Sequence, residues 1–542
     1  MARLIRLIGG CLFFSLLILA GPGAAGAATL GGKVTDGNGR ALSGVYVSAK
    51  DLVRKMAVSV LSDAHGRYEI ADLFPSRYRV RVRRIGFQPL TLDGVVVGDS
   101  GATRNFRLAA SSEIGQQMPA NAWLASLPAG PMKSKFLVGC TICHQFGNAA
   151  TRAPRSAQEW SQLYPKMRQI ASLGSENQGY AHLLDDLDPQ QLGQWLAANG
   201  FGPHAAHHFT APPAATGAAL HAVVTEYDVG GPMAGAHDMA IDPTTGMAWV
   251  GDFFPGLLIR INPINNAQKT YQSPVRGGGL HTLQFDRNGI LWCTLMLSEM
   301  VASFDPKTGQ FNIYDHFSRG SATHSFATDA FGYIQYDRHG RLWLSEFMGN
   351  AVASLDPKSG QVREYPSPSR VGHPYGIALD SKEHVWYAKY GSNLIDELDP
   401  ESGRVTEHRM PGADSSPHRI TIDAKDRLWT PDDGYSSLVM YDIAKGTFKS
   451  YPLPDKDSSP YAARVDGATG RIWVNVPGAD AIYRFDPATE RFTIFRLPSP
   501  VSYTRMVSID YATGDIWSSL SNLPTGHMGR DHAEVIRLHL AQ

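Results

Sequence analysis

A repeat of about 43 residues constrains the fold of this chain more than any other feature. From residue 221 onward, an Asp recurs at intervals of 44, 51, 43, 43, 43 and 44 residues, and a Trp shortly after it at intervals of 43, 51, 43, 43, 44 and 44. A unit of this length with four short strands is typical of one β-propeller blade. The seven units therefore predict a seven-bladed β-propeller over residues 214–542. The repeated residues are Asp242, Asp286, Asp337, Asp380, Asp423, Asp466 and Asp510, followed by Trp249, Trp292, Trp343, Trp386, Trp429, Trp473 and Trp517.

The two ends of the repeat predict how the ring closes. Residues 533–540, AEVIRLHL, have the pattern of a third strand with no fourth strand after it. Residues 222–229, AVVTEYDV, have the pattern of an outer strand with no blade before it. Pairing of these two segments would close the ring and remove its open edges.

The middle region, residues 111–213, has helical periodicity and a motif for covalent haem. Residues 140–144 are Cys-Thr-Ile-Cys-His, the spacing at which two thiols attach a c-type haem and the adjoining His binds the iron. A disulfide or a zinc site would need another pair of ligands, and outside the N-terminal segment only Cys293 remains. The sequence predicts one haem c held by Cys140, Cys143 and His144.

The haem iron needs a distal ligand as well. Residues 158–170 and 188–201 have the pattern of two amphipathic helices. The pair resembles the small cytochrome c domains, in which a helix that begins with Glu-Trp supplies an axial Met and a closing helix ends in Trp-Leu-Ala-Ala-Asn-Gly-Phe. This resemblance implies Met167 as the distal ligand, with Met132 and His182 as alternatives.

The N-terminus has the pattern of an export signal. Two arginines precede an apolar stretch over residues 7–20, and an Ala25-Gly26-Ala27 segment follows. The apolar stretch is shorter than the ~20 residues needed to cross a bilayer. We expect cleavage near Ala27, a periplasmic location, and a mature chain without a transmembrane segment.

Residues 28–110 alternate between apolar and polar positions in short segments separated by turns. In one of them Tyr78, Val80 and Val82 face one side and arginines face the other. Together with G-x-V-x-D-x-x-G-x-x-L-x-G-V-x-V and D-x-x-G-x-Y, this segment resembles the carboxypeptidase regulatory-like domains, which implies a β-sandwich with a docking role.

The fold class is thus mainly β and multidomain: a β-sandwich, a small α-helical cytochrome c domain and a propeller. Lys+Arg and Asp+Glu are both 50, so nothing in the charge suggests a nucleic-acid partner.

The repeat phrases P-x-G-I-A-x-D, L-W-x-x-E and N-x-I-x-x-L-D-P resemble the streptogramin (virginiamycin B) lyase family of propellers. This resemblance implies an Mg²⁺-dependent elimination with a His base on an inner strand, a second His in the preceding blade, and a Glu fourteen residues after the base. His418 occupies the position of the base. Asp432 stands where the Glu is expected, and Tyr375 where the second His is expected, with His373 two residues away.

Two positions of each unit are expected at one mouth of the channel. The residues five before each repeated Asp are His237, His281, Gly332, Tyr375, His418, Tyr461 and Arg505. The residues three after each repeated Trp are Asp252, Leu295, Glu346, Lys389, Asp432, Val476 and Leu520. Such groups can bind a divalent metal, with His237, His281 and His418 as candidates, or act as acids and bases. A solvated polar channel is the alternative.

The one long interval indicates an insertion of about eight residues within 314–332. It carries His316 and His324, and because it precedes an inner strand we expect it to overhang one mouth of the ring. It is either a lid or ligand donor, or surface decoration.

Three functions are compatible with these features. The first is an exported haem c oxidoreductase whose propeller binds a small-molecule or carbohydrate-like ligand and whose haem exchanges electrons with a redox partner protein or a membrane acceptor. The second is a metal-dependent lyase with an accessory cytochrome. The third is a non-catalytic, electron-carrying binding protein. If chemistry takes place in the channel, the expected residues are His418, Asp432, His281, His237, Glu346 and Tyr375.

Overall fold

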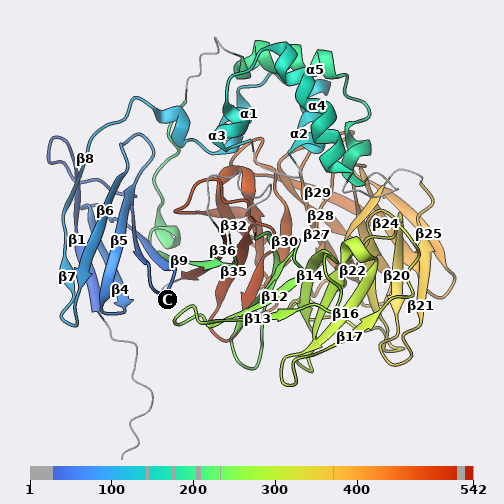
Figure 1. Cartoon of the computed structure of the whole chain (residues 1–542). Coiled ribbons are helices and arrows are strands. Elements are labelled where there is room, and N and C mark those ends of the chain that lie inside the picture. Colours follow the sequence, from blue (N-terminus) through green and yellow to red (C-terminus); the bar gives the residue numbers. More distant parts are fainter. Residues whose placement is uncertain are drawn as a thin grey trace, which may run out of the picture.

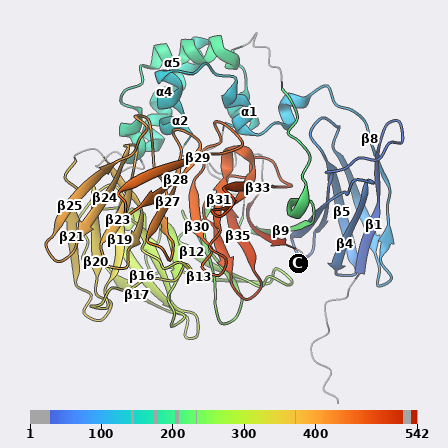
Figure 2. The same ribbon diagram turned by 180° about the vertical axis from the view of Figure 1, so that it is seen from behind.

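The computed structural model describes residues 28–141, 146–172, 179–202, 209–231, 234–369, 372–521 and 532–540. The predicted signal, Cys143 and His144 lie outside the described residues. Three parts are visible: a sandwich at one side, a propeller, and a helical region over one mouth of the propeller (Figures 1 and 2). No described helix is long and apolar enough to cross a membrane.

The N-terminal part is a β-sandwich, as the alternating pattern predicts. One sheet contains β1 (Ala28–Asp36), β4 (Arg67–Leu73), β7 (Ala102–Thr103) and β8 (Phe106–Leu108), and the other contains β2 (Tyr46–Asp51), β3 (Met56–Leu61), β5 (Ser76–Arg83) and β6 (Leu90–Val97). On β5, Tyr78, Val80 and Val82 are buried, whereas Arg79 and Arg81 are exposed. Burial of one face of each sheet forms the core of the sandwich.

The helical region consists of short helices around an aromatic core. They are η1 (Ile114–Gln117), α1 (Ala120–Ala125), α2 (Pro131–Cys140), α3 (Ala149–Arg152), α4 (Ala157–Ala171), η2 (Gly179–Leu184), α5 (Pro189–Leu196) and η3 (Ala197–Phe201). Helix α4 begins with a capping box between Ser156 and Glu159. The indole of Trp160 donates to the carbonyl of Phe201 (3.0 Å), which joins α4 to the end of α5 and η3. The two helices predicted at residues 158–170 and 188–201 are thus present.

The described C-terminal residues form seven four-stranded antiparallel blades. A short connection with η4 (Gly217–Ala219) leads into them, and two loops contain η5 (Met296–Ser298) and η6 (Pro477–Ala479). From the axis outward the first three blades are β10 (Ala236–Ile241), β11 (Ala248–Asp252), β12 (Leu257–Ile261) and β13 (Gln268–Gln272); β14 (Leu280–Phe285), β15 (Leu291–Leu295), β16 (Met300–Asp305) and β17 (Gln310–Tyr314); and β18 (Thr323–Phe326), β19 (Leu342–Glu346), β20 (Ala351–Leu355) and β21 (Val362–Pro366). The next three are β22 (His373–Leu379), β23 (Val385–Tyr390), β24 (Leu394–Asp399) and β25 (Arg404–Arg409); β26 (Thr421–Ile422), β27 (Arg427–Asp432), β28 (Ser437–Asp442) and β29 (Thr447–Pro452); and β30 (Ala462–Val465), β31 (Ile472–Val476), β32 (Ala481–Asp486) and β33 (Arg491–Arg496).

The seventh blade confirms the predicted ring closure. It contains β34 (Ser508–Asp510), β35 (Asp515–Leu520), β36 (Ala533–Leu540) and, as its outer strand, β9 (Ala222–Val229). β9 pairs with β36 from Ala222↔Leu540 to Val229↔Ala533. The other edge of β9 pairs with β3, so one eight-stranded sheet runs from the propeller into the sandwich. The sandwich therefore covers an edge that would otherwise be exposed.

The repeated Asp stabilises the turn after each inner strand, and in blades two to five it also bonds the repeated Trp. In the fourth blade one oxygen of Asp380 accepts from the backbone amides of Lys382 and His384 (both 2.9 Å), and the other accepts from the indole of Trp386 (3.0 Å). Asp380 is 3% exposed. In this blade the repeated Asp is therefore a buried acceptor that holds the turn and the repeated Trp together.

We expect Asp380→Ala to lower the free energy of unfolding by about 2–4 kcal/mol, because three donors lose their acceptor and at least the indole is buried. Urea unfolding followed by Trp fluorescence measures this loss. Asp399→Ala is the matched control, since Asp399 makes similar bonds in an exposed turn of the same blade. If both variants lose the same free energy of unfolding, the burial of Asp380 does not strengthen its contribution to stability.

Candidate site at the covered mouth of the propeller

Seven side chains, one from each blade, form a ring around the channel at one mouth. Consecutive ring centroids lie 3.8, 4.0, 4.0, 4.0 and 4.1 Å apart along the first six, and the guanidinium of the seventh lies 5.1 Å from the ring centroid of the sixth. All seven are buried. In order they are His237, His281, His324, Tyr375, His418, Tyr461 and Arg505. We call this set the channel ring.

Six of these seven positions agree with the sequence prediction, and the third blade corrects it. His324 occupies the place expected for Gly332. The extra residues follow the inner strand β18 instead of preceding it, so counting back from Asp337 shifts the position by eight residues. The Thr-His-Ser sequence at 323–325 resembles Leu-His-Thr at 280–282 and is the local signal that identifies His324.

The extra residues after β18 contact three other blades at the end of the channel away from the ring, so they are neither a lid over the ring nor surface decoration, whereas His324 of the predicted segment lies in the ring itself. Gly332 accepts from the side chain of Gln284. Thr328 accepts from Arg464 (2.8 Å), and the carbonyl of Ala330 accepts from Tyr511 (3.1 Å). These contacts join the third blade to the second, sixth and seventh. His316 lies on an exposed loop and takes no part in these contacts.

A buried ion pair crosses the channel next to the ring. Arg419 donates from Nη1 to Oδ2 of Asp238 (2.7 Å) and from Nη2 to Oδ1 (2.9 Å). The Nδ1 atom of His237 lies 3.0 Å from the same carboxylate. Arg419 and Asp238 are 4% and 0% exposed. The pair connects the first and fifth blades and was not identified from the sequence, because it depends on which blades face each other.

Burial keeps the histidines of the channel ring uncharged. It lowers the pKa of His237 to about 4, although the bond to Asp238 acts in the opposite direction. Burial and then neighbouring charges lower the pKa of His281, His324 and His418. Among the described residues no hydrogen bond of good geometry reaches either ring nitrogen of His418, although the backbone of Tyr461 acts to raise its pKa. At neutral pH this histidine is therefore uncharged, and one of its ring nitrogens can accept a hydrogen bond.

The charged residues predicted from the second strands have different roles. Burial raises the pKa of Glu346 to about 9, and the nearby Glu364 adds to this effect. Lys389 pairs with Asp396 (3.3 Å), so its charge is balanced within its own blade. Asp432 accepts from the amides of Ser416 (2.8 Å) and Gly434 (3.1 Å) and thereby holds the loop before His418.

Two of the three candidate metal ligands lie together. Donor atoms of His237, Asp238 and His281 are all within 4.8 Å of one another, and all three residues are buried. His418 is separated from His281 by His324 and Tyr375 in the order of the ring. Because Asp238 already binds Arg419 through both oxygens, a cation at this position would compete with a guanidinium.

The helical region covers the mouth that carries the channel ring. The hydroxyl of Tyr390 donates to the carbonyl of Val138 on α2 (2.8 Å), and Tyr180 packs at a tilt against Phe347 with ring centroids 4.6 Å apart. At the edge, Lys133 pairs with Asp457 (2.8 Å). These contacts merge the helical core and the propeller mouth into one apolar cluster that includes Tyr375 and Tyr461.

The predicted haem-binding segment begins at this interface. Cys140 ends α2 as a half-buried residue, and the hydroxyl of Thr141 lies 3.3 Å from that of Ser459. Tyr503 donates to the carbonyl of Thr141 (3.5 Å). Tyr503 lies on the channel side, because the guanidinium of Arg505 stacks 4.0 Å from its ring centroid. The side chain of Tyr503 thus connects the start of the segment to Arg505 of the channel ring.

The proposed distal ligands are in different environments. Met167 is 39% exposed on α4, one turn after Tyr164, whose phenol lies within electrostatic range of Cys140. Met132 packs against the apolar cluster between the helices and the propeller. The side chain of His182 lies outside the described residues.

Comparisons with known proteins agree with two of the three parts. The virginiamycin B lyase family model matches residues 217–436, and the carboxypeptidase regulatory-like domain model matches residues 29–109. A streptogramin B lyase structure superposes with a TM-score of 0.52 at 18% identity, covering 60% of this chain and 100% of that one. A virginiamycin B lyase from Staphylococcus aureus gives 0.50 at 19% identity, covering 59% and 99%. No curated protein matches the chain.

The chain therefore has a virginiamycin B lyase-like propeller and a carboxypeptidase regulatory-like domain. At these identities the structural likeness shows the fold. The two matched segments leave the helical region between them uncovered.

Proposed function

We propose that this protein is an exported haem c protein in which the covered mouth of the propeller binds a small molecule and exchanges single electrons with the haem. The position of the helical region carries the proposal. The helix that ends in Cys140 packs on the propeller through Tyr390 and Val138, directly over the buried channel ring.

The ligands predicted for a c-type haem come from this helical region. Cys140 is the last residue of α2, and Met167 offers a thioether on α4. Cys140 and Cys143 would form the thioether bonds, His144 would be the proximal ligand, and Met167 the distal ligand, with Met132 or His182 in its place as alternatives. The group would supply a one-electron donor or acceptor whose potential is raised by thioether ligation.

The residues of the channel ring would bind and orient the small molecule. His418 is neutral, so one of its ring nitrogens can accept a hydrogen bond from a bound hydroxyl or amine. The hydroxyls of Tyr375 and Tyr461 lie 2.6 Å apart and can relay a hydrogen bond to that molecule. The helical cover excludes water, which strengthens each of these polar contacts.

Haem content tests the first part of the proposal. Protein matured in a periplasm with haem attachment machinery should contain one iron per chain and show a c-type spectrum that survives acid–acetone extraction. Cys140→Ser with Cys143→Ser should lose this iron completely, whereas Cys293→Ala, a buried cysteine of β15, should keep it. Wild-type protein without covalent haem would overturn the proposal.

A lyase-like role is the second candidate, and the family match over 217–436 together with His418 at the position of the base favours it. One related structure is a virginiamycin B lyase with quinupristin. If this chain has the same activity, it should linearise quinupristin in the presence of Mg²⁺, and His418→Ala should abolish turnover. We expect no turnover, because Tyr375 replaces the second His and Asp432 is engaged by backbone amides. Turnover lost in His418→Ala would favour the lyase.

A further inference from the structure

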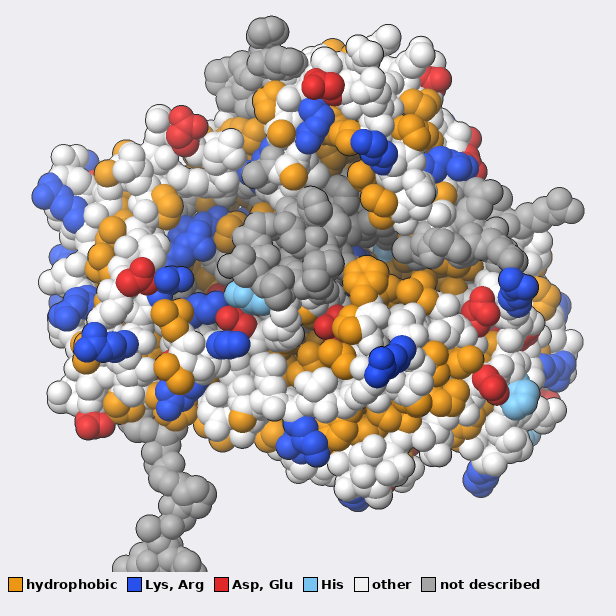
Figure 3. All heavy atoms as spheres, viewed as in Figure 1, with side chains coloured by type: hydrophobic (Ala, Val, Ile, Leu, Met, Phe, Trp, Pro, Cys, Tyr) orange, Lys and Arg blue, Asp and Glu red, His pale blue; other side chains and the backbone are white. Residues whose placement is uncertain are grey.

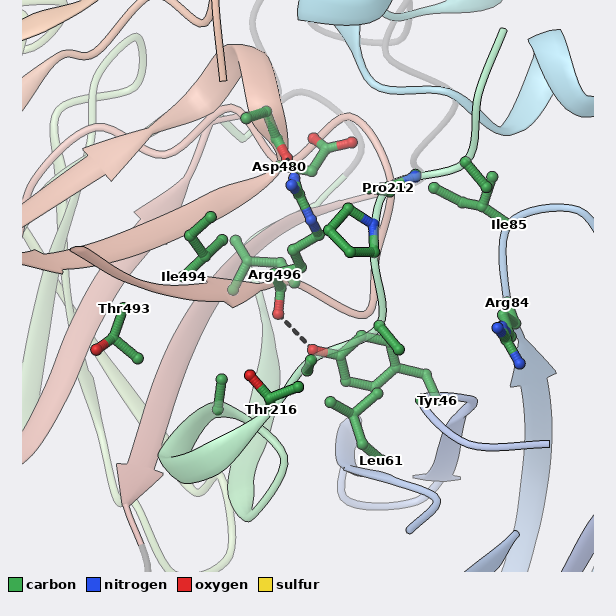
Figure 4. A pocket seen from close by; sticks show the side chains of 18 of the residues that line it. Tyr46, Leu61, Arg84, Ile85, Pro212, Thr216, Asp480, Thr493, Ile494 and Arg496 are labelled. Atoms are coloured by element: carbon green, nitrogen blue, oxygen red, sulfur yellow. Dashed lines mark hydrogen bonds between the residues drawn. The ribbon is translucent and has the colours of Figure 1, made fainter. Parts of the chain in front are cut away.

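A cavity of about 590 Å³ lies where the sandwich, the linker before the propeller and the sixth blade meet. This volume is in the range of small-molecule sites, ~300–1,000 Å³. Figure 4 shows Tyr46 at the start of β2, Pro212 and Thr216 of the linker, and Ile494 and Arg496 of β33 around one space. The cavity is separate from the channel ring, and the functions considered above do not involve it.

The lining of the cavity is strongly positive. Four arginines and one aspartate line it. Arg496 is balanced by Asp455, outside the lining, at 3.0 Å. The carboxylate of Asp480 accepts from the amide and hydroxyl of Ser502 (2.7 and 2.9 Å) and from the amide of Val501 (3.2 Å). It is therefore directed to the loop before β34 and makes no ion pair with the lining arginines.

The other three arginines have no carboxylate within 4.0 Å among the described residues. Arg83 donates to the carbonyls of Pro498 (3.0 Å) and Gln117 (3.3 Å), and burial lowers its pKa. The guanidinium of Arg84 lies 5.4 Å from the ring of Phe87, and that of Arg484 lies 5.7 Å from the ring of Trp473. On the face seen in Figure 3, Lys and Arg side chains gather between the sandwich and the propeller.

Apolar side chains supply the rest of the wall. They come from the sandwich and the sixth blade and include Leu61, Ile85, Phe492, Ile494 and Leu497. Guanidinium groups without carboxylate partners bind phosphate and carboxylate groups through paired hydrogen bonds. We propose that this cavity binds a small organic anion, with its phosphate or carboxylate on Arg83, Arg84 and Arg484 and its apolar body against the aliphatic and aromatic wall.

Three probes with one aromatic body test this site on the full mature chain. 1-Naphthyl phosphate and 1-naphthoate carry the two possible anionic groups, and 1-naphthol carries no charge. By isothermal titration calorimetry we expect one site per chain for at least one of the two anions, and binding of 1-naphthol at least about tenfold weaker. The anion that binds with the higher affinity shows whether the site prefers a phosphate or a carboxylate group.

Variants locate the binding. Arg84→Gln and Arg484→Gln should each weaken binding of the preferred anion at least about fivefold, since each removes a charge-assisted contact. Arg471→Gln removes a charge from the same blade at a half-exposed position outside the lining, so its affinity should stay within about twofold of wild type. Thr216→Trp fills the cavity without a change of charge and should abolish binding. Three results would overturn the proposal. They are binding of 1-naphthol as tight as that of the anions, a loss of affinity in Arg471→Gln as large as in the two lining variants, and no saturable binding of either anion.

Discussion

Asp238→Ala should destabilise the propeller by about 3–5 kcal/mol, the largest loss that we expect from a single change in the channel. The substitution removes both acceptors of Arg419, which bonds Asp238 at 2.7 and 2.9 Å with almost no exposure to water. The guanidinium would remain buried and positive between the rings of Tyr375 and Tyr461. Urea unfolding at pH 7 measures the change.

A second variant separates loss of the pair from loss of packing. Asp238→Ala combined with Arg419→Met removes both charges and keeps a long apolar side chain in the channel. We expect this double variant to recover more than half of the stability lost by Asp238→Ala, because the main cost is the unpaired buried charge. If Asp238→Ala costs less than about 1 kcal/mol, or if the double variant is no better, the ion pair does not join the two blades energetically.

The sequence predicts this propeller well because each blade repeats the same local chemistry. The repeated Asp accepts from the amides of its own turn, and in blades two to five it also accepts from the repeated Trp, so the period reflects a recurring hydrogen-bonded turn. The same regularity placed His237, His281, Tyr375 and His418 in the channel. Closure of the ring by residues 222–229 could also be predicted. The last blade lacks its outer strand and the first is preceded by an extra strand, so these two ends can complete one blade by pairing with each other.

The prediction was wrong where the chain departs from the repeat or where parts meet. The insertion after β18 shifted the third blade by eight residues, and period alone cannot distinguish an insertion before a strand from one after it. The pair of Arg419 and Asp238 depends on the circular arrangement of blades. The placement of α2 over the mouth depends on contacts such as Tyr390 to Val138, between residues 252 positions apart.

Glu346 should make the stability of the propeller fall as the pH rises. It is 1% exposed, and burial together with the neighbouring Glu364 raises its pKa to about 9 from the ordinary 4.5. The folded chain thus keeps this proton up to about pH 9, whereas the unfolded chain releases it near pH 4.5. Between these values the unfolded state binds fewer protons, so the free energy of unfolding decreases by about 1.4 kcal/mol per pH unit from this group.

Glu346→Gln removes this titration while it keeps the shape of the side chain and a donor toward Glu364. We expect the variant and the wild type to be similar near pH 4.5, and the variant to be more stable by about 3–5 kcal/mol at pH 8. Urea midpoints at pH 4.5, 6 and 8 measure the difference. Glu401→Gln, an exposed carboxylate of the fourth blade, should track the wild type within about 0.5 kcal/mol at each pH.

The sign of the difference also tests what Glu346 does at the mouth of the channel. A carboxylate that is charged in the folded state would be held by donors, and its replacement by Gln would then destabilise the chain at pH 8. Among the described residues its Oε1 atom has no hydrogen-bond partner, and burial and the neighbouring Glu364 both disfavour the charged form. A neutral Glu346 can donate a hydrogen bond, and it lies opposite Thr323, the residue before His324 of the channel ring. A variant that is less stable at pH 8 would show that the carboxylate is ionised and would remove this donor from the site.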